Sequence, residues 1–237
     1  MTYCFLSAMA AEVEPILKAA TLIGEEHLGF ARLYHLDYQG IPFYVCLSGV
    51  GKVLAGSAAT ACCLTHKDID AFINIGIGGS LDAIKAPCLS AVIGKDFAQH
   101  DLDTTAVGDP LGYLSGLDII KIDADSALNE KISGVCEEIG IPCCEGSIAS
   151  GDRFIANETD MTKVVKNFGA LLIDMEASAY AEVCYLYHKP FTALRIVSDA
   201  VDHEKEYVQN KKAACEKACL VALALLSSSS HAHANRI

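Results

Sequence analysis

The alternation of short apolar segments with longer amphipathic ones constrains this chain most. The short segments are rich in β-branched residues and have the length of buried strands, whereas the longer ones repeat apolar residues at helical spacing. The predicted strands are residues 3–8, 42–48, 71–76, 89–93, 146–150, 171–174 and 191–198. The predicted helices are residues 10–20, 53–66, 125–139, 176–187 and about 205–226. Strands that alternate with helices need crossover connections, so we expect an α/β fold of three layers, with helices on both faces of a central mixed, mostly parallel twisted sheet.

The length of the chain fits one domain. Its 237 residues lie within the range of undivided α/β domains, and no composition shift marks a linker. We therefore expect a single domain over residues 1–226. Residues 227–237 are polar and patternless and are predicted to be a disordered tail, and residues 94–118 are predicted to form a long loop.

Composition excludes several classes of protein. With 52% hydrophobic and 20% charged residues the chain is too apolar to be disordered, yet no apolar run approaches the roughly 18 residues of a membrane span. A net charge of −12 disfavours nucleic acid as a partner. The eleven cysteines are scattered without CxxC spacing, which is typical of reduced core thiols. We expect a soluble, cytoplasmic protein.

Carboxylates stand where apolar segments end. Asp174, Glu176 and Asp199 lie between residues 171 and 199, and Glu12 follows the first predicted strand. Ligands of open α/β sheets bind beyond the carboxyl ends of the strands, so these acids are placed to meet a substrate. A structural alternative stays open for three of them: Glu12 and Glu176 as first-turn helix acids and Asp199 as a helix cap.

Three predicted glycine turns follow strands, at residues 48–52 (SGVGK), 76–80 (GIGGS) and 150–152 (SGD). They match neither the GxGxxG dinucleotide fingerprint nor the P-loop, and the sequence contains no GxSxG or HExxH motif. With these motifs absent, catalysis by carboxylates is the chemistry that the sequence favours. Cleavage of a glycosidic-type bond uses one acid that carries a proton and another that stays ionised.

Seven motifs, in order, carry a family resemblance: AMAAEVEP, SGVGKV, INIGIGG, QHDLDTTAVG, SGDRFI, DMEASAYAEVC and RIVSDAVD. In order and spacing they resemble the nucleoside phosphorylase and hydrolase superfamily, and within it the nucleosidases of 5′-methylthioadenosine and S-adenosylhomocysteine. The resemblance implies a nucleoside phosphorylase-like fold, a homodimer and a small-molecule nucleoside substrate. The implied reaction is hydrolysis of the N-glycosidic bond to adenine and the thioribose, without a metal or an organic cofactor.

The resemblance also implies roles for individual residues. Asp199, with Ser198 beside it, protonates the purine at N7, and Glu12 deprotonates the attacking water with help from Arg195. Glu176 holds the ribose hydroxyls. The remaining residues expected to bind substrate are Met175 on the sugar, Phe154 and Ile155 at the adenine, Ile77, Gly78 and Ser150, and Thr104 and Val107 reaching the pocket of a partner subunit.

Two residues depart from the family pattern. Ile77 stands where these nucleosidases place a small polar residue, which could alter the preferred 5′ substituent. Arg153 replaces a small residue directly before Phe154, and it either faces solvent, pairs with Asp152, or recognises an acidic substituent.

Phosphorylases of the superfamily gather arginines around phosphate. This chain has no arginine before Arg32 and none near the third predicted strand, so water is the expected nucleophile. Three alternatives remain open: a purine or uridine phosphorylase, a hydrolase of a different purine nucleoside, and a nucleoside-binding protein without activity.

Overall fold

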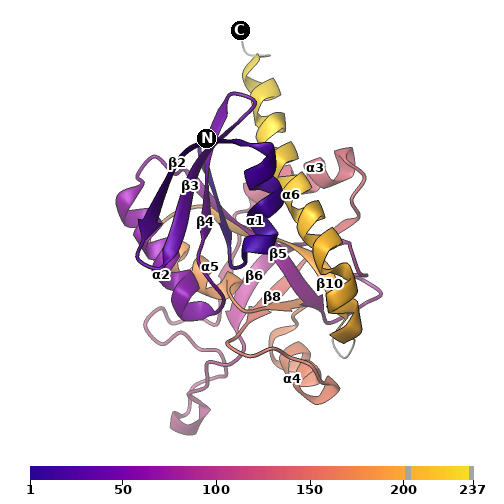
Figure 1. The fold of residues 1–237 in the computed structure, drawn as a ribbon. Helices are drawn as coiled ribbons and strands as arrows, with labels where there is room; N and C mark the ends of the chain where they lie inside the picture. The colour runs from indigo at the N-terminus through magenta and orange to yellow at the C-terminus, as the bar shows by residue number, and fades with distance from the viewer. Residues whose placement is uncertain (201–203, 235–237) are drawn as a thin grey trace.

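The computed structural model describes residues 1–200 and 204–234, which form one mixed ten-stranded sheet and six α-helices (Figure 1). The strands are β1 (Tyr3–Ser7), β2 (Thr21–Leu28), β3 (Ala31–Tyr38), β4 (Ile41–Leu47), β5 (Ala71–Ser80), β6 (Ala91–Gln99), β7 (Lys121–Asp123), β8 (Cys143–Ser150), β9 (Leu172–Asp174) and β10 (Phe191–Ala200). The helices are α1 (Ala10–Ala19), α2 (Lys52–Thr65), α3 (Ser126–Glu138), α4 (Glu158–Phe168), α5 (Ala177–Leu186) and α6 (Glu204–Ala234), with a 3₁₀ turn η1 (Thr105–Val107). The predicted α/β class is confirmed.

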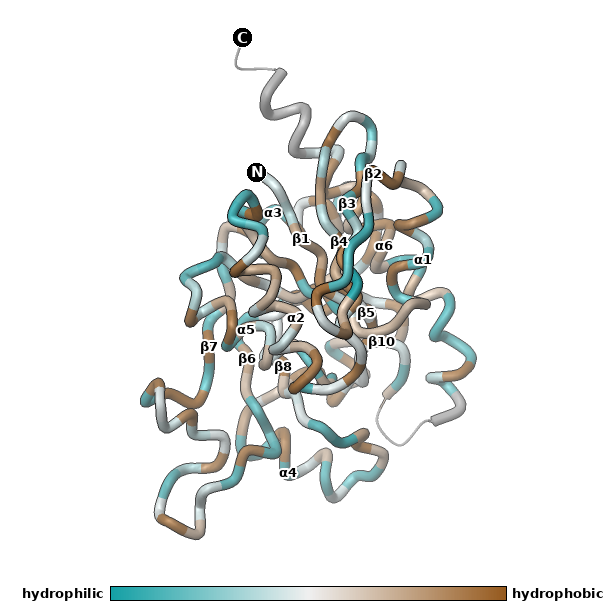
Figure 2. Tube along the Cα trace, turned by 60° about the vertical axis from the view of Figure 1, so that its left-hand side comes forward, coloured by the Kyte–Doolittle hydropathy of each residue, from teal (hydrophilic) through white to brown (hydrophobic). Residues whose placement is uncertain are grey.

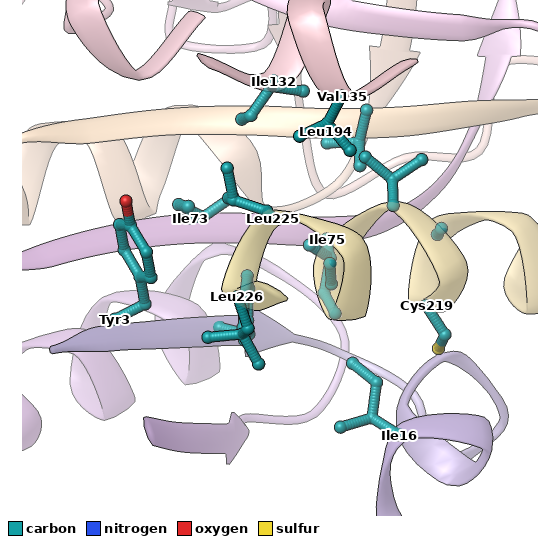
Figure 3. Close-up of a cluster of buried hydrophobic side chains, with 14 of the residues drawn as sticks. Tyr3, Ile16, Ile73, Ile75, Ile132, Val135, Leu194, Cys219, Leu225 and Leu226 are labelled. Atoms are coloured by element: carbon teal, nitrogen blue, oxygen red, sulfur yellow. The ribbon is translucent and has the colours of Figure 1, made fainter. Parts of the chain in front are cut away.

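Two apolar clusters pack on opposite sides of the central strands. Successive residues of β1 alternate between them, because side chains of a strand point to opposite faces: Phe5 belongs to the first cluster and Leu6 to the second. Helices α1, α3 and α6 close the first cluster, which includes Leu225 and Leu226 of α6 and Ile73 and Ile75 of β5 (Figure 3). Helices α2 and α5 close the second.

The prediction of a mostly parallel sheet is wrong. Of the ten strand pairings among the described residues, five are parallel and five antiparallel. Strands β2 and β3, absent from the prediction, extend β4 as an antiparallel meander. The turn between β3 and β4 has positive φ at both Gln39 and Gly40, the geometry that a tight two-residue hairpin requires.

Strand β10 joins the two parts of the sheet. It pairs in parallel with β5 and antiparallel with β6, and the further pairings β6–β8, β8–β9 and β9–β5 return to β5. The carboxyl ends of β8, β9 and β10 are thereby brought close to β5. This arrangement brings the acids at the strand ends, Asp174 and Asp199, to one region beside β5.

Three local predictions need correction. The loop predicted from residue 94 begins later, because β6 continues to Gln99 and its buried Asp96 pairs with Lys121 of β7 (2.9 Å); the loop then extends away from the sheet (Figures 1 and 2). Residues 76–80 belong to β5 and form no turn. Helix α4 was not predicted, although Asn157 caps its start and Gly169 its end.

The C-terminal helix is longer than the predicted one. Helix α6 continues to Ala234, into the segment predicted to be a tail, and residues 235–237 lie outside the described residues. In the part of the chain that the structure describes, no helix is both long and apolar enough to cross a membrane.

Candidate active site

A cleft with about 780 Å³ of empty space opens beside the ends of β9 and β10 and the start of α1. Its walls come from seven separate segments of the chain. They comprise Ala8, Met9, Glu12, Val50, Ile77, Gly78, Gly79, Arg153, Phe154, Ile155, Ile173, Asp174, Met175, Glu176, Ser198, Asp199 and Tyr207.

Glu12 is buried at the bottom of this cleft and its carboxylate is held from two sides. Oε2 accepts hydrogen bonds from Ser7 Oγ (2.7 Å) and from the backbone N–H groups of Ala8 (3.2 Å) and Met9 (3.0 Å). Oε1 accepts from the N–H of Ile77 (3.0 Å). The hydrogen bond from the Met9 N–H caps helix α1, whereas the hydrogen bond from the Ile77 N–H comes from β5 and has no part in capping. Glu12 is therefore both a capping acid and a cleft residue.

Arg195 lies behind the cleft, fully buried in β10, and faces three carboxylates. Its Nη2 lies 2.6 Å from Asp174 Oδ2 and 3.4 Å from Glu176 Oε2, and its Nη1 lies 3.7 Å from Glu12 Oε1. Burial alone lowers the pKa of Arg195, but these three charges outweigh it and raise the pKa above its usual range. The guanidinium is therefore a permanent cation, and it is outnumbered by the acids around it.

Gly76 makes this convergence possible. A Cβ at this position of β5 would lie 2.9 Å from Glu12 Cδ and closer still to Arg195 Nη1 and Glu12 Oε1. A side chain cannot occupy that space without displacing the pair. The glycines of the INIGIGG motif thus serve close approach within a strand, not the turn predicted for them.

Glu176 directs its side chain into the cleft and makes no capping bond to α5. Oε1 accepts from the N–H of Gly51 (3.0 Å), and Oε2 accepts from Arg195. Burial raises the pKa of Glu176 to about 7, against the opposing pull of Arg195. The sequence predicted an ionised Glu176, but Arg195 lies closer to Asp174, so its charge does not offset the burial.

Asp199 occupies β10 and is not a helix cap. The register of β10 against β5 shifts between Val197 and Asp199, and this bulge re-aims the residues at the end of the strand. Ser198 Oγ donates to Asp199 Oδ1 (2.5 Å). Burial raises the pKa of Asp199 above its ordinary value, the hydrogen bond from Ser198 opposes this increase, and the charge of Glu206 adds to it. The proton-carrying role of Asp199 stays a prediction.

Apolar side chains complete the cleft near Asp199. Phe154 and Tyr207 pack edge to face with ring centroids 6.1 Å apart, while Ile155 is buried. Phe154 remains 54% exposed, so its ring is free to contact a planar ligand. The cleft thus combines an acidic end at Glu12 and Glu176 with an aromatic wall at Phe154.

Comparison with known proteins identifies the family. The model of the phosphorylase superfamily matches residues 2–227, nearly the whole chain. The chain belongs to the phosphorylase superfamily. A 5′-methylthioadenosine/S-adenosylhomocysteine nucleosidase of Staphylococcus aureus is 31% identical over 202 residues, which cover 85% of this chain and 87% of the relative. The resemblance noted in the sequence is confirmed.

Solved structures of the superfamily share the fold. The nucleosidase of Neisseria meningitidis, in complex with methylthio-immucillin-A, matches with a TM-score of 0.88 and 26% identity over 96% of this chain and 99% of that one. The futalosine hydrolase of Helicobacter pylori matches with a TM-score of 0.89, covering 96% of this chain and 98% of that one. Its 24% identity shows a common fold.

The two departures from the family pattern have defined places in this phosphorylase-superfamily protein. Ile77 lines the cleft with its side chain and positions Glu12 with its N–H. Arg153 stands at the mouth, 63% exposed, and pairs with Asp160 of α4 (2.5 Å), not with Asp152. The partner could not be foreseen because α4 itself was not predicted.

The structure separates the remaining predicted binding residues into groups. Gly78 and Met175 line the cleft, whereas Ser150 lies behind it, donating to Asp174 Oδ1 (2.5 Å). Thr104 and Val107 are absent from the described lining of this chain's own cleft. Their expected place in a partner's pocket stays a prediction.

The roles of three residues of the site could not be predicted from the sequence. Asp174 was noted as a strand-end acid, but its role as the nearest partner of Arg195 was not foreseen. Ser7 bonds to Glu12 from the end of β1, a position that suggested nothing beyond a strand end. Tyr207 reaches the cleft from α6, where only helical periodicity was visible.

Proposed function

We propose that this protein hydrolyses the N-glycosidic bond of 5′-thio-substituted adenosines, 5′-methylthioadenosine and S-adenosylhomocysteine, to adenine and the thioribose. One observation carries the proposal. Three carboxylates, Glu12, Asp174 and Glu176, surround the single guanidinium of Arg195 beside a cleft whose other wall is aromatic. An acidic site next to a base platform suits a reaction in which the ribose becomes cationic.

Asp199 supplies the proton for the leaving group in this scheme. A purine leaves poorly as an anion, and protonation at N7 makes it a neutral leaving group. The raised pKa of Asp199 favours the proton-carrying acid relative to an ordinary aspartate, and general acid help of this kind contributes roughly 10² to 10⁴ in rate. Phe154 stacks on the adenine, and the backbone of Ile155 binds its edge.

Glu12 activates the water. Three donors converge on Oε2, whereas Oε1 has one close donor, the N–H of Ile77, and the more distant Arg195. The lone pairs of Oε2 are thus engaged, so Oε1 is the atom with capacity for a water proton. Arg195 fixes the orientation of the Glu12 carboxylate from the side that faces away from the cleft.

Glu176 binds the ribose hydroxyls, with Met175 packed on the sugar. Hydroxyl donors favour the ionised form of a carboxylate, so bound substrate pulls the pKa of Glu176 downward from about 7. The ionised carboxylate then stabilises the oxocarbenium-like ribose at the moment when its charge develops.

The charges of the cleft favour water over phosphate as the nucleophile. Arg195 is already surrounded by acids, and Arg153 is the one cation in the described lining and is paired with Asp160. A phosphate dianion needs unengaged cations and would be repelled by Glu12 and Glu176. A purine nucleoside phosphorylase is the weaker candidate on this ground.

The cysteines support a location in the cytoplasm. All eleven are free thiols, as is typical of a protein in a reducing compartment.

The proposed protein is a homodimer, in which Thr104 and Val107 of one subunit reach the 5′ end of the other subunit's pocket. Its fold is a three-layer arrangement, which the apolar clusters on both faces of the sheet support.

An adenine-release assay tests the proposed function. Purified protein is incubated with methylthioadenosine, S-adenosylhomocysteine, adenosine and inosine, first without phosphate and then with it. We expect release of adenine from the two thio-substituted nucleosides at a rate that phosphate leaves unchanged. A requirement for phosphate, with formation of a ribose 1-phosphate, would establish phosphorolysis instead. Faster cleavage of inosine would identify a different purine nucleoside as substrate.

A further inference from the structure

A closed ring of hydrogen bonds joins three segments at the rim of the cleft. The N–H of Lys52, the first residue of α2, donates to Asp152 Oδ1 (2.8 Å). The N–H of Asp152 donates to Asp101 Oδ2 (2.8 Å), and Lys52 Nζ donates to Asp101 Oδ1 (2.5 Å). The ring therefore connects the start of α2, the loop after β6 and the turn after β8.

Two residues of this ring, Lys52 and Asp152, lie next in sequence to segments that line or contact the candidate active site. Gly51, directly before Lys52, donates its N–H to Glu176 Oε1 (3.0 Å), and Asp152 precedes the aromatic Phe154 by two residues. Gly51 has a φ of 98°, and a Cβ there would lie 3.0 Å from Asp152 Oδ1. The carboxylate of Asp152 therefore packs directly against Gly51 while it holds the next N–H along the chain.

We propose that Asp152 is a positioning residue for Glu176: by binding the N–H of Lys52 it aims the N–H of Gly51 at the carboxylate that holds the sugar. Asp152 acts through the Gly51–Lys52 segment and does not contact Glu176 itself. Asp101 in turn fixes Asp152 by accepting its N–H. The inference rests on the proposed function for the role of Glu176 as the sugar ligand, but the orientation of Gly51 can be tested without turnover.

The other charged and titratable groups that face Glu176 come from four elements. They are Arg195 of β10, Asp174 of β9, Glu12 of α1 and Tyr180 of α5. Truncation of Asp152 to Ala leaves these groups in place, releases the Gly51 N–H and removes one negative charge; Asp152→Asn removes the same charge and keeps the acceptor, so the difference between the two variants isolates the hydrogen bond. Burial raises the pKa of Glu176 and the Gly51 N–H lowers it, so loss of that bond moves the pKa further upward.

The test is a ¹³C NMR titration of glutamate-labelled protein, with the Glu176 signal assigned by its loss in Glu176→Gln. We expect Asp152→Ala to raise the titration midpoint of Glu176 by roughly half to one pH unit, the effect of one lost hydrogen bond. Asp152→Asn keeps an oxygen that accepts the Lys52 N–H and should retain the wild-type midpoint. Asp101→Ala should shift it in the same direction as Asp152→Ala, by less.

Asp37→Ala is the matched control, because Asp37 also accepts one backbone N–H at an exposed turn, that of Gly40 (2.9 Å), far along the sheet. The titration midpoint of Glu176 in Asp37→Ala should equal that in the wild type. An unchanged midpoint in Asp152→Ala, or an equal shift in Asp152→Asn, would overturn the positioning role. Wild-type protein that releases no adenine would refute the proposed function, and the titration would still decide the role of Asp152.

Discussion

Glu176 should make the folded protein less stable as the pH rises, and Glu176→Gln should remove that effect. Burial raises the pKa of Glu176 from 4.5 to about 7 in the folded state. Between these two pH values the unfolded chain releases the proton while the folded protein retains it. A raised pKa therefore gives stability that is complete below pH 4.5 and is lost as the pH approaches 7.

The size of this effect follows from the shift. About 2.5 pKa units correspond to about 3 kcal/mol in the free energy of unfolding, an upper value because neighbouring acids share the charge. Glutamine keeps an acceptor for the Gly51 N–H and has no charge to bury. The free energy of unfolding of Glu176→Gln should therefore rise by up to about 3 kcal/mol relative to wild type as the pH increases from 4.5 to 8, whereas its turnover should fall.

Urea unfolding at pH 4.5, 6 and 8, at one protein concentration, measures the difference between the two proteins. Glu25→Gln, at an exposed site on β2, controls for the loss of a negative charge as such. If the stabilities of wild type and Glu176→Gln run parallel across this range, Glu176 is ionised in the folded protein throughout, and the reasoning from burial is refuted.

Three further substitutions test the chemistry of the cleft. Asp199→Asn should keep the fold, since its side-chain oxygen still accepts from Ser198, and lower kcat by roughly 10² to 10⁴; unchanged turnover would remove Asp199 from the mechanism. Glu12→Gln should bind methylthioadenosine in a calorimetric titration but cleave it slowly, and loss of binding instead would show that Glu12 is a substrate ligand and not the base. Gly76→Ala should destabilise the protein by about 1 to 3 kcal/mol and reduce activity, because its Cβ displaces Arg195 and Glu12; a fully active, equally stable variant would contradict the close packing.

Sequence patterns predicted the fold class and the residues whose position along a strand carries information. Glu12, Glu176 and Asp199 follow apolar segments, and parallel strands collect such positions at one edge, so their convergence in one cleft could be anticipated. Helices α2, α3 and α5 were also placed within two residues of their ends, because their apolar periodicity is strong.

Features that depend on contacts between distant segments could not be predicted. The pairing of Arg195 with Asp174 depends on the register of β10 and β9 around β5, which single-sequence patterns do not encode. Strand β2 was missed because it is exposed along most of its length and lacks a buried face. The raised pKa of Glu176 could not be predicted either, because it depends on how deeply the folded chain buries the carboxyl and on how close Arg195 lies to it.

The position of Arg195 links the fold to the proposed chemistry. A buried guanidinium needs carboxylate partners, and three acids around it leave the cluster with an excess of negative charge. Such a cluster repels an anionic nucleophile and is partly neutralised by protons while the site is empty, as the pKa of Glu176 indicates. A substrate that becomes cationic at its sugar relieves this excess, so the charge that destabilises the empty cleft is the charge that favours the transition state.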